Sequence, residues 1–267
     1  MRRVGLPERR VIGGNVAVPA IGGGGPAPAP AFTPTDIAGL VAWFDMKDAA
    51  AFTQVADVIT SLTNKASSVV WDTGTLPAYA ATGFNGFPCM NFNGTTQYIL
   101  STEAAVLAEV TNSPSATLIV VCNYALADAN NTLFGAGNSA QAANGSIRYG
   151  ISATGNGRRL VSSVNDAGTT TNLTSAGDSS AADQIVFYHS SGLTGGISLN
   201  NAADDPNGAA FNPGASTPDQ LAIGARPRLA LDTFMSGDIA EMLLYNSSLS
   251  AENKTSLYDY LDAKWLP

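Results

Sequence analysis

Short runs of β-branched and aromatic residues recur along most of this chain, each bounded by clusters of Gly, Asn, Ser, Thr or Asp. From residue 32 onward the runs cover residues 40–44, 58–62, 89–92, 117–124, 132–134, 147–151, 160–164, 185–189, 196–199, 221–223 and 239–245. Runs of this length between turn-forming residues indicate antiparallel strands. So many strands within one domain predict an all-β fold built as a sandwich of two sheets.

The pattern inside a run predicts how its strand is covered. Polar and apolar faces alternate along residues 185–189, which predicts a strand with one wet face, whereas residues 118–122 are continuously apolar and predict a strand between two layers. Residues 239–245 are apolar on both faces and predict a central strand. We expect Asp238 and Glu241 to satisfy turn amides or to face solvent.

Two helices are predicted, the clearer one at the C-terminus. Ser250 is a good N-cap, and Glu252 lies in the first turn, where the helix dipole favours an acid. Leu257, Leu261 and Trp265 follow at intervals of four residues, so one apolar stripe docks on the sandwich. Alanine, leucine and glutamate cluster over residues 102–110 and predict a second, shorter helix.

Three segments resemble concanavalin A-like, laminin G-type jelly-roll domains. They are residues 37–45, residues 84–98 and, above all, residues 237–252 continued by 260–265. The resemblance spans about residues 36 to 266 and implies two curved antiparallel sheets. Such domains occur as carbohydrate-binding modules, adhesion domains and appended domains of bacteriophage virion proteins, so the fold alone leaves the function open.

Residues 1–31 differ in composition from the rest of the chain. They hold Arg2, Arg3, Arg9 and Arg10 against Glu8, a local charge of +3. Four consecutive glycines and an alternation of proline with alanine follow, which is typical of a hinge joined to a semi-rigid spacer. We therefore predict an extended basic anchoring arm over 1–31 and a jelly-roll domain over 32–267. The alternative is that the arm is an unstructured tail or linker.

Charge and composition exclude several classes of function. The chain has 13 bases and 21 acids, a net charge of −8, which argues against a nucleic-acid partner. No apolar run approaches the roughly 20 residues of a membrane span, and Gly13, Gly14 and Pro19 interrupt the stretch that a secretory signal requires. We expect a soluble protein without a membrane partner or a cleaved signal.

Catalytic and metal sites are hard to build from this sequence. Two cysteines and one histidine exclude a disulfide framework, a four-cysteine zinc site and any site with several imidazoles. No strand carries alternating acids that would point two carboxylates at one glycosidic bond. The pair Asp204-Asp205 lies in a turn rich in Asn, Pro and Gly, and we interpret it as structural. With Asn207 it is also a weak candidate for Ca²⁺. We otherwise expect no cofactor and no enzymatic activity, and we interpret His189 as a packed or surface residue.

Binding has more support than catalysis. Loops rich in Asn, Ser and Gly at residues 125–146, 165–183 and 200–219 are long enough to form a shallow polar site. These loops are nearly free of aromatic residues. Trp71 and Tyr79 are therefore the candidates for stacking on a sugar ring, against the alternative that Trp71 belongs to the core.

These observations lead to two hypotheses about function. The first is a non-enzymatic bacteriophage virion protein, a capsid decoration or accessory protein displayed on the outer surface of the particle as a homo-oligomer. Arg2, Arg3, Arg9 and Arg10 of its arm would bind the major capsid protein or another virion protein. The alternative is a carbohydrate-binding or adhesion module whose partners are host-surface glycans.

Overall fold

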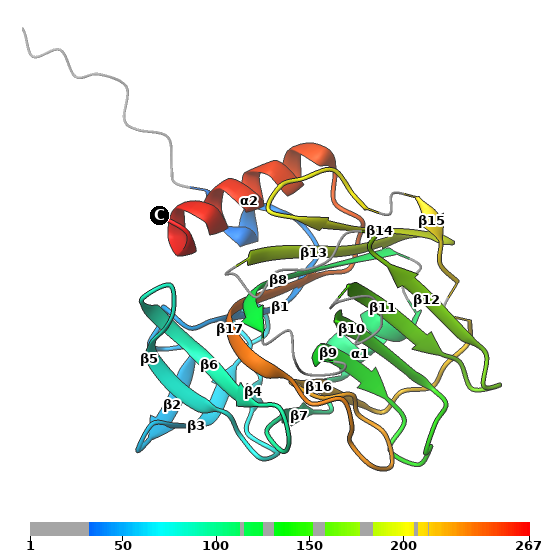
Figure 1. The fold of residues 1–267 in the computed structure, drawn as a ribbon, viewed down its shortest axis with the longest axis horizontal. Helices are drawn as coiled ribbons and strands as arrows, with labels where there is room; N and C mark the ends of the chain where they lie inside the picture. The colour runs from blue at the N-terminus through cyan, green and yellow to red at the C-terminus, as the bar shows by residue number, and fades with distance from the viewer. Residues whose placement is uncertain are drawn as a thin grey trace, which may run out of the picture. The chain divides into compact units, whose positions relative to one another are not determined.

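The computed structural model describes residues 32–112, 115–124, 131–151, 158–176, 184–205, 208–212 and 214–267. The predicted arm, with Arg2, Arg3, Arg9 and Arg10, lies outside these residues, as does Asn207. The described chain forms two antiparallel sheets that face each other, with a helix on the outside (Figure 1). The predicted all-β sandwich with a short C-terminal helix is confirmed.

The larger sheet has eleven strands in the described residues. Its main path is β15-β14-β13-β8-β17-β6-β5-β3-β2, while β1 pairs with β17 and β4 with β3. The bounds are β1 Leu40–Asp45, β2 Phe52–Val55, β3 Val58–Thr63, β4 Val70–Trp71, β5 Ala78–Phe84, β6 Phe87–Asn93, β8 Ser115–Tyr124, β13 Gln184–Ser191, β14 Thr194–Leu199, β15 Ala209–Ala210 and β17 Ser236–Tyr245.

The smaller sheet has six strands in the order β12-β11-β10-β9-β16-β7, again counted over the described residues. The bounds are β7 Ile99–Ser101, β9 Asn131–Gly137, β10 Ser146–Ile151, β11 Arg159–Val164, β12 Thr170–Thr174 and β16 Gln220–Ile223. A 3₁₀ turn over Pro34–Asp36 precedes β1, and the two helices are α1 Ala104–Asn112 and α2 Ala251–Trp265. No helix among the described residues is long and apolar enough to span a membrane.

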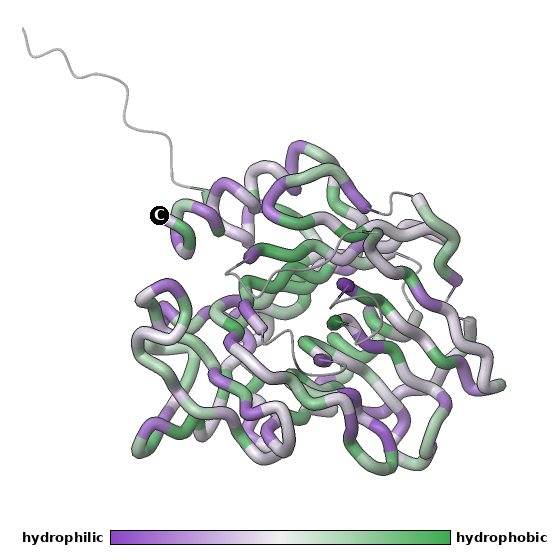
Figure 2. Tube along the Cα trace, viewed as in Figure 1, coloured by the Kyte–Doolittle hydropathy of each residue, from purple (hydrophilic) through white to green (hydrophobic). Residues whose placement is uncertain are grey.

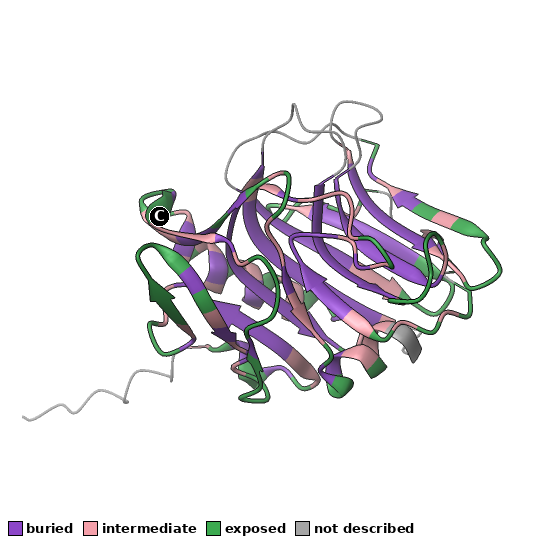
Figure 3. Cartoon of the chain, turned by 90° about the horizontal axis from the view of Figure 1, so that it is seen from below, coloured by how far each residue is buried: buried purple, intermediate pink, exposed green. Residues whose placement is uncertain are grey.

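The core lies between the two sheets and is formed by the alternate residues of each strand that point inward. Tyr188 of β13 points across the sandwich, where its hydroxyl donates to the carbonyl of Gly150 in β10 at 3.0 Å. Ile147 and Tyr149 of β10 face the same core. The central strands are mostly hydrophobic (Figure 2), and exposed residues gather in turns and at the sheet edges (Figure 3). Each strand of the smaller sheet therefore turns its remaining side chains outward.

Strand β17 is a central strand of the larger sheet, as its apolar pattern predicts. Along one side it pairs with β8, and along the other with β6 over its first residues and then with β1. The register shifts at Ala240, between the two partners, and its carbonyl accepts from the amide of Met46 at 3.1 Å. A bulge at this point lets one long strand pair first with β6 and then with β1 along the same side.

The expectation for Glu241 is wrong, because its side chain is fully buried under α2. Its carboxylate accepts from the indole nitrogens of Trp43 at 2.7 Å and Trp265 at 2.6 Å, and from Lys264 at 2.7 Å. Burial alone would lower the pKa of Lys264, but Glu241 and Asp45 raise it above its ordinary value. The acid thus anchors the end of α2 to the sheet.

Both predicted helices are confirmed. The Ser250 hydroxyl accepts from the amide of Asn253 at 3.2 Å, and Leu257, Leu261 and Trp265 are buried. The strand β12 was not predicted, since residues 165–183 read as a loop. Its sequence, TTNLT, has a single apolar residue, Leu173, because it is an edge strand with one polar face.

Candidate functional site

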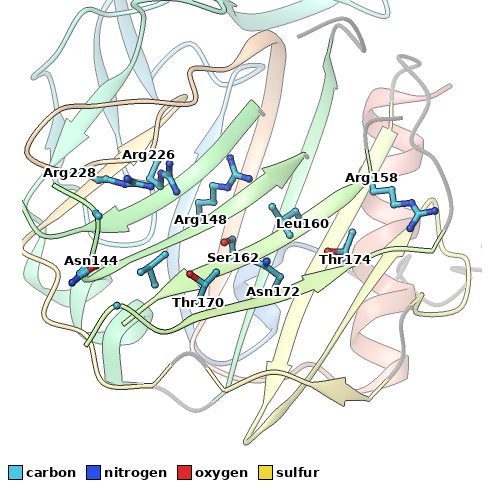
Figure 4. A pocket seen from close by; sticks show the side chains of 13 residues that line it. Asn144, Arg148, Arg158, Leu160, Ser162, Thr170, Asn172, Thr174, Arg226 and Arg228 are labelled. Carbon is cyan, nitrogen blue, oxygen red and sulfur yellow. The ribbon is translucent and has the colours of Figure 1, made fainter. Parts of the chain in front are cut away.

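A hollow of about 860 Å³ lies on the outer face of the smaller sheet, turned away from the core (Figure 4). Its described lining comes from β10, β11, β12 and the segments around them: Ala143, Asn144, Arg148, Arg158, Leu160, Ser162, Val164, Gly168, Thr170, Asn172, Thr174, Arg226 and Arg228. This lining contains four arginines, no acid and no aromatic residue.

Strand register explains the floor of the hollow. Arg148 of β10 lies opposite Ser162 of β11, which in turn lies opposite Asn172 of β12. The next row outward along the strands is Gly150, Leu160 and Thr174. Because neighbouring residues such as Tyr149 and Val161 point into the core, these rows must face outward. The sheet therefore presents hydroxyl, amide and aliphatic groups around one guanidinium.

Arg226 and Arg228 reach the hollow because the segment 224–232 folds back over β9. Pro227 lies directly on the strand, where a β-carbon at Gly135 would be 2.9 Å from its Cδ and one at Gly137 would overlap its carbonyl. Two side-chain-free positions on β9 thus form the seat of the segment. Arg228 Nη1 also donates to the carbonyl of Ala142 at 3.2 Å, which ties the segment to the rim.

The guanidinium groups differ in how they are held. Arg226 forms a bidentate pair with Asp232, with Nε–Oδ1 and Nη2–Oδ2 distances of 2.7 Å, and Arg228 lies 3.6 Å from the same carboxylate. Burial lowers the pKa of Arg148 to about 10, and the charge of Arg226 acts in the same direction, while Asp232 opposes it. Arg148 thus stays protonated at neutral pH beside a group of like charge.

The concentration of positive charge is unusual for this chain. After residue 31 the sequence has 9 bases against 20 acids, and only five of the bases are arginines. Four of those five line the hollow, and the fifth, Arg159, follows Arg158 directly in β11. An otherwise acidic domain therefore has one strongly basic depression, which is suited to an anion.

The chemistry of the lining is that of a binding site. Arginine offers a planar fork of donors that matches a carboxylate, sulfate or phosphate, and Ser162, Asn172 and Thr174 offer partners for hydroxyl groups. Leu160 adds an aliphatic surface. A glycosidase needs two converging carboxylates, and the described lining supplies none.

The structure does not make Trp71 available for stacking on a ligand. The residue is 1% exposed, and its ring packs edge-on against that of Phe44, with 4.8 Å between the ring centroids. Its indole N–H donates to the carboxylate of Glu103 at 2.7 Å. Its amphipathic ring is satisfied within the core, as the alternative interpretation expected. Tyr79 is partly exposed on β5, stacked on Phe52 at 5.2 Å, and belongs to the other sheet. Neither residue contributes to the hollow.

Asp204 and Asp205 lie in the segment after β14, outside the described lining of the hollow. Asp204 is 2.8 Å from Nε2 of His189 and 3.1 Å from Nζ of Lys254. Burial alone would raise its pKa, but these two partners lower it below the ordinary value. The Asp205 carboxylate accepts from the amide of Ala176 at 3.2 Å. The carboxylate of Asp204 is thus engaged by two basic side chains.

Sequence reasoning missed the arginines, although two signals were available. Arg148 sits at a polar position between the core residues Ile147 and Tyr149. The arginines of the domain also fall in only two short stretches, residues 148–159 and 226–228. Of the loops predicted to form a polar site, residues 125–146 and 165–183 do contribute Asn144 and Gly168.

Comparisons with known proteins extend the fold assignment. No protein-family model matches the chain, and no curated protein matches its sequence. Among solved structures, the CBM40 module of Ruminococcus gnavus IT-sialidase matches with a TM-score of 0.52 and 16% identity, over 64% of this chain and 96% of the module. The likeness shows a lectin-like sandwich of two antiparallel sheets.

Whole sialidases also match, through part of their length. Trypanosoma rangeli sialidase in complex with the inhibitor DANA has a TM-score of 0.51 at 16% identity, covering 82% of this chain and 32% of the sialidase. NanB sialidase from Streptococcus pneumoniae has a TM-score of 0.47 at 18% identity over 63% of this chain, which spans 27% of NanB.

Proposed function

We propose that this protein is a carbohydrate-binding module that binds acidic glycans in the arginine-lined hollow and leaves them chemically unchanged. The observation that carries the proposal is that four arginines, from three separate parts of the chain, line a depression of an acidic domain whose described lining has no acid. Like charges held together oppose folding, and Asp232 offers only one carboxylate to Arg226 and Arg228, so an anionic ligand accounts for the cluster.

The lining suggests how a sugar is held. A carboxylate or sulfate would lie between Arg148, Arg226 and Arg228, where charge-assisted bidentate hydrogen bonds are strongest. Ring hydroxyls would exchange hydrogen bonds with Ser162 and Asn172, and the C–H face would contact Leu160. The recognition we propose uses charge and hydrogen bonds in place of aromatic stacking, because the described lining has no aromatic ring.

The structural comparisons support this class of ligand. One of the similar structures, with a TM-score of 0.51, is the Ruminococcus gnavus CBM40 bound to alpha2,3 sialyllactose. Sialyllactose carries a carboxylate, the group that the arginines of the hollow would recognise. The proposal corresponds to the second hypothesis from the sequence, a module that binds host-surface glycans. The virion role, with its capsid partner and oligomeric assembly, stays a prediction.

A glycan array followed by calorimetry tests the proposal. We expect the wild type to bind glycans with carboxylate or sulfate groups and to ignore their neutral counterparts. Arg148→Met should weaken binding about 10- to 100-fold, the effect of losing hydrogen bonds to a charged group. Lys254→Met removes a positive charge on α2, outside the described lining of the hollow, and should change affinity less than about twofold, as expected for a screened charge that does not contact the ligand.

Two results would overturn the proposed function. One is equal binding of acidic glycans and their neutral counterparts, or no binding of either. The other is an Arg148→Met variant that is folded and retains wild-type affinity.

A further inference from the structure

The arginines of the hollow form two separate groups. Arg148, Arg226 and Arg228 lie together toward one end, while Arg158 lies at the other end, at the start of β11 (Figure 4). Arg148 is level with Ser162, and Ser162 follows Arg158 by four residues. At about 3.3 Å per residue, the two levels are roughly 13 Å apart along the strand.

The surface between these two groups is uncharged. It consists of Leu160 and Ser162 from β11 with Asn172 and Thr174 from β12. A single carboxylate or sulfate cannot contact arginines at both ends of such a strip. The volume of the hollow, about 860 Å³, is also larger than one pyranose ring requires, and Ser162, Asn172 and Thr174 provide polar groups along the strip.

We propose that the hollow binds a glycan with at least two acidic groups on different sugar residues. One group is held by Arg148, Arg226 and Arg228, the second by Arg158, and the intervening sugar lies on the uncharged strip. This inference rests on the proposed function and specifies its ligand as a polyacidic oligosaccharide.

The two groups of arginines make different contributions to affinity. The three-arginine group is the primary anchor because it can surround one anion and is fixed by Asp232 and the Pro227 seat. Once the first acid is bound, the second is delivered to Arg158 at a high effective concentration. Arg158 should therefore matter only for ligands long enough to span the strip.

Calorimetry with matched pairs of ligands tests the inference. Each pair contains a glycan with one acidic residue and its oligomer with three: sialyllactose with trisialyllactose, galacturonate with trigalacturonate, and a singly with a multiply sulfated oligosaccharide. For at least one pair, we expect the oligomer to bind the wild type at least about tenfold more tightly than the single acid.

Variants at the two ends separate their roles. Arg158→Gln should abolish the advantage of the oligomer and leave the affinity for the single acid within about twofold, as for a residue it does not contact. Arg158→Lys, which keeps the charge, should retain much of the advantage. Arg228→Gln should weaken both ligands. Thermal unfolding identifies any variant that misfolds, and the wild-type comparison stands without the variants.

The outcomes distinguish this inference from the proposed function. If single acids bind but their oligomers bind no more tightly, the two-acid ligand is wrong and the acidic-glycan site remains. Loss of affinity for the single acid in Arg158→Gln also contradicts the division of roles. If no acidic glycan of any pair binds the wild type, both proposals fall together.

Discussion

At the scale of single residues, charged side chains are buried on both sheets, and their environments indicate different roles. Arg148 is 6% exposed and lies beside another guanidinium on the face that forms the hollow. Glu241 is fully buried, but it is surrounded by donors that satisfy both of its oxygens. Arg148, Arg226 and Arg228 share the single carboxylate of Asp232, which favours a further anion from a ligand. The charge of Glu241, in contrast, is matched by donors within the fold, which indicates a structural role.

Glu241 provides a stability prediction. Glu241→Leu leaves the indole N–H groups of Trp43 and Trp265 without their acceptor under α2, and Lys264 keeps only Asp45 as a carboxylate partner. We expect the free energy of unfolding in urea to fall by about 3–5 kcal/mol, the cost of breaking a buried pair by removing one partner. Glu252→Gln, at an exposed position in the first turn of α2, should cost less than about 1 kcal/mol. Similar losses in both variants would contradict the anchoring role.

The residue scale is also where sequence-based prediction reached its limit. The apolar pattern of β17 predicted a central strand, but nothing near Glu241 in the sequence identifies Trp43 or Trp265 as its partners. Trp71 had two possible roles, and the choice depended on the distant Glu103. Such assignments require the tertiary packing, which a local pattern does not contain.

At the scale of elements, the segment 224–232 connects the fold to the proposed site. It returns over β9 because Gly135 and Gly137 leave room for Pro227, and it carries Arg226 and Arg228 into the hollow. Alternation predicted β10 and β11 and hence an outward position for Arg148. The return of the segment was not predictable, because a glycine in a strand reads equally well as a weak strand residue.

A methyl group at Gly137 should therefore disturb binding. In Gly137→Ala the new carbon overlaps the Pro227 carbonyl, so the segment must shift off β9. We expect affinity for acidic glycans to fall at least about tenfold, since a displaced arginine loses its charged hydrogen bonds.

Gly83→Ala is the matched control for this experiment. A β-carbon there would be 2.5 Å from Sγ of Cys89, so the variant is also overpacked, but it lies on β5 of the other sheet. It should lose stability and keep its affinity. Equal losses of affinity in the two variants would mean that the seat of the segment has no specific role.

The contact between α2 and β13 predicts a pH dependence. Burial lowers the pKa of His189, Lys254 acts in the same direction, and Asp204 opposes them. Free histidine titrates near pH 6.5, so as the pH falls from about 7.5 to about 5.5 the unfolded chain binds this proton first. The free energy of unfolding should therefore decrease on acidification.

His189→Gln removes the only histidine of the chain and should flatten this dependence. Urea unfolding at several pH values measures the difference between the variant and the wild type, in which the contributions of all other groups cancel. Parallel curves for the two proteins, or a wild type that gains stability on acidification, would contradict the assignment.

At the scale of the whole molecule, the arginines are concentrated in one place. The domain after residue 31 has a net charge of −11, from 9 bases and 20 acids, yet four of its five arginines line one hollow. The resemblance to jelly-roll domains predicted the two sheets and the terminal helix. It did not predict which face of which sheet carries the candidate site, because related sandwiches place different sites on the same framework.

Because positive charge is concentrated in the hollow, we expect binding of an acidic ligand to be sensitive to salt. Raising the NaCl concentration from about 0.05 M to about 0.5 M shortens the screening length well below the roughly 13 Å between the two groups of arginines. Affinity for a polyacidic glycan should fall by about tenfold or more, and that of Arg158→Gln should fall less steeply. An affinity that does not vary with salt would show that hydrogen bonds alone hold the ligand.

The positions of the three tryptophans have a practical consequence. Trp43 and Trp265 donate to Glu241 beneath α2, and Trp71 donates to Glu103 in the core, so no indole lines the hollow. Intrinsic fluorescence should thus follow the detachment of α2 and the loss of the core, while staying silent when a sugar is added. A glycan site of the kind proposed would therefore be missed by a screen based on tryptophan quenching, and calorimetry or mass spectrometry is the suitable way to look for its ligand.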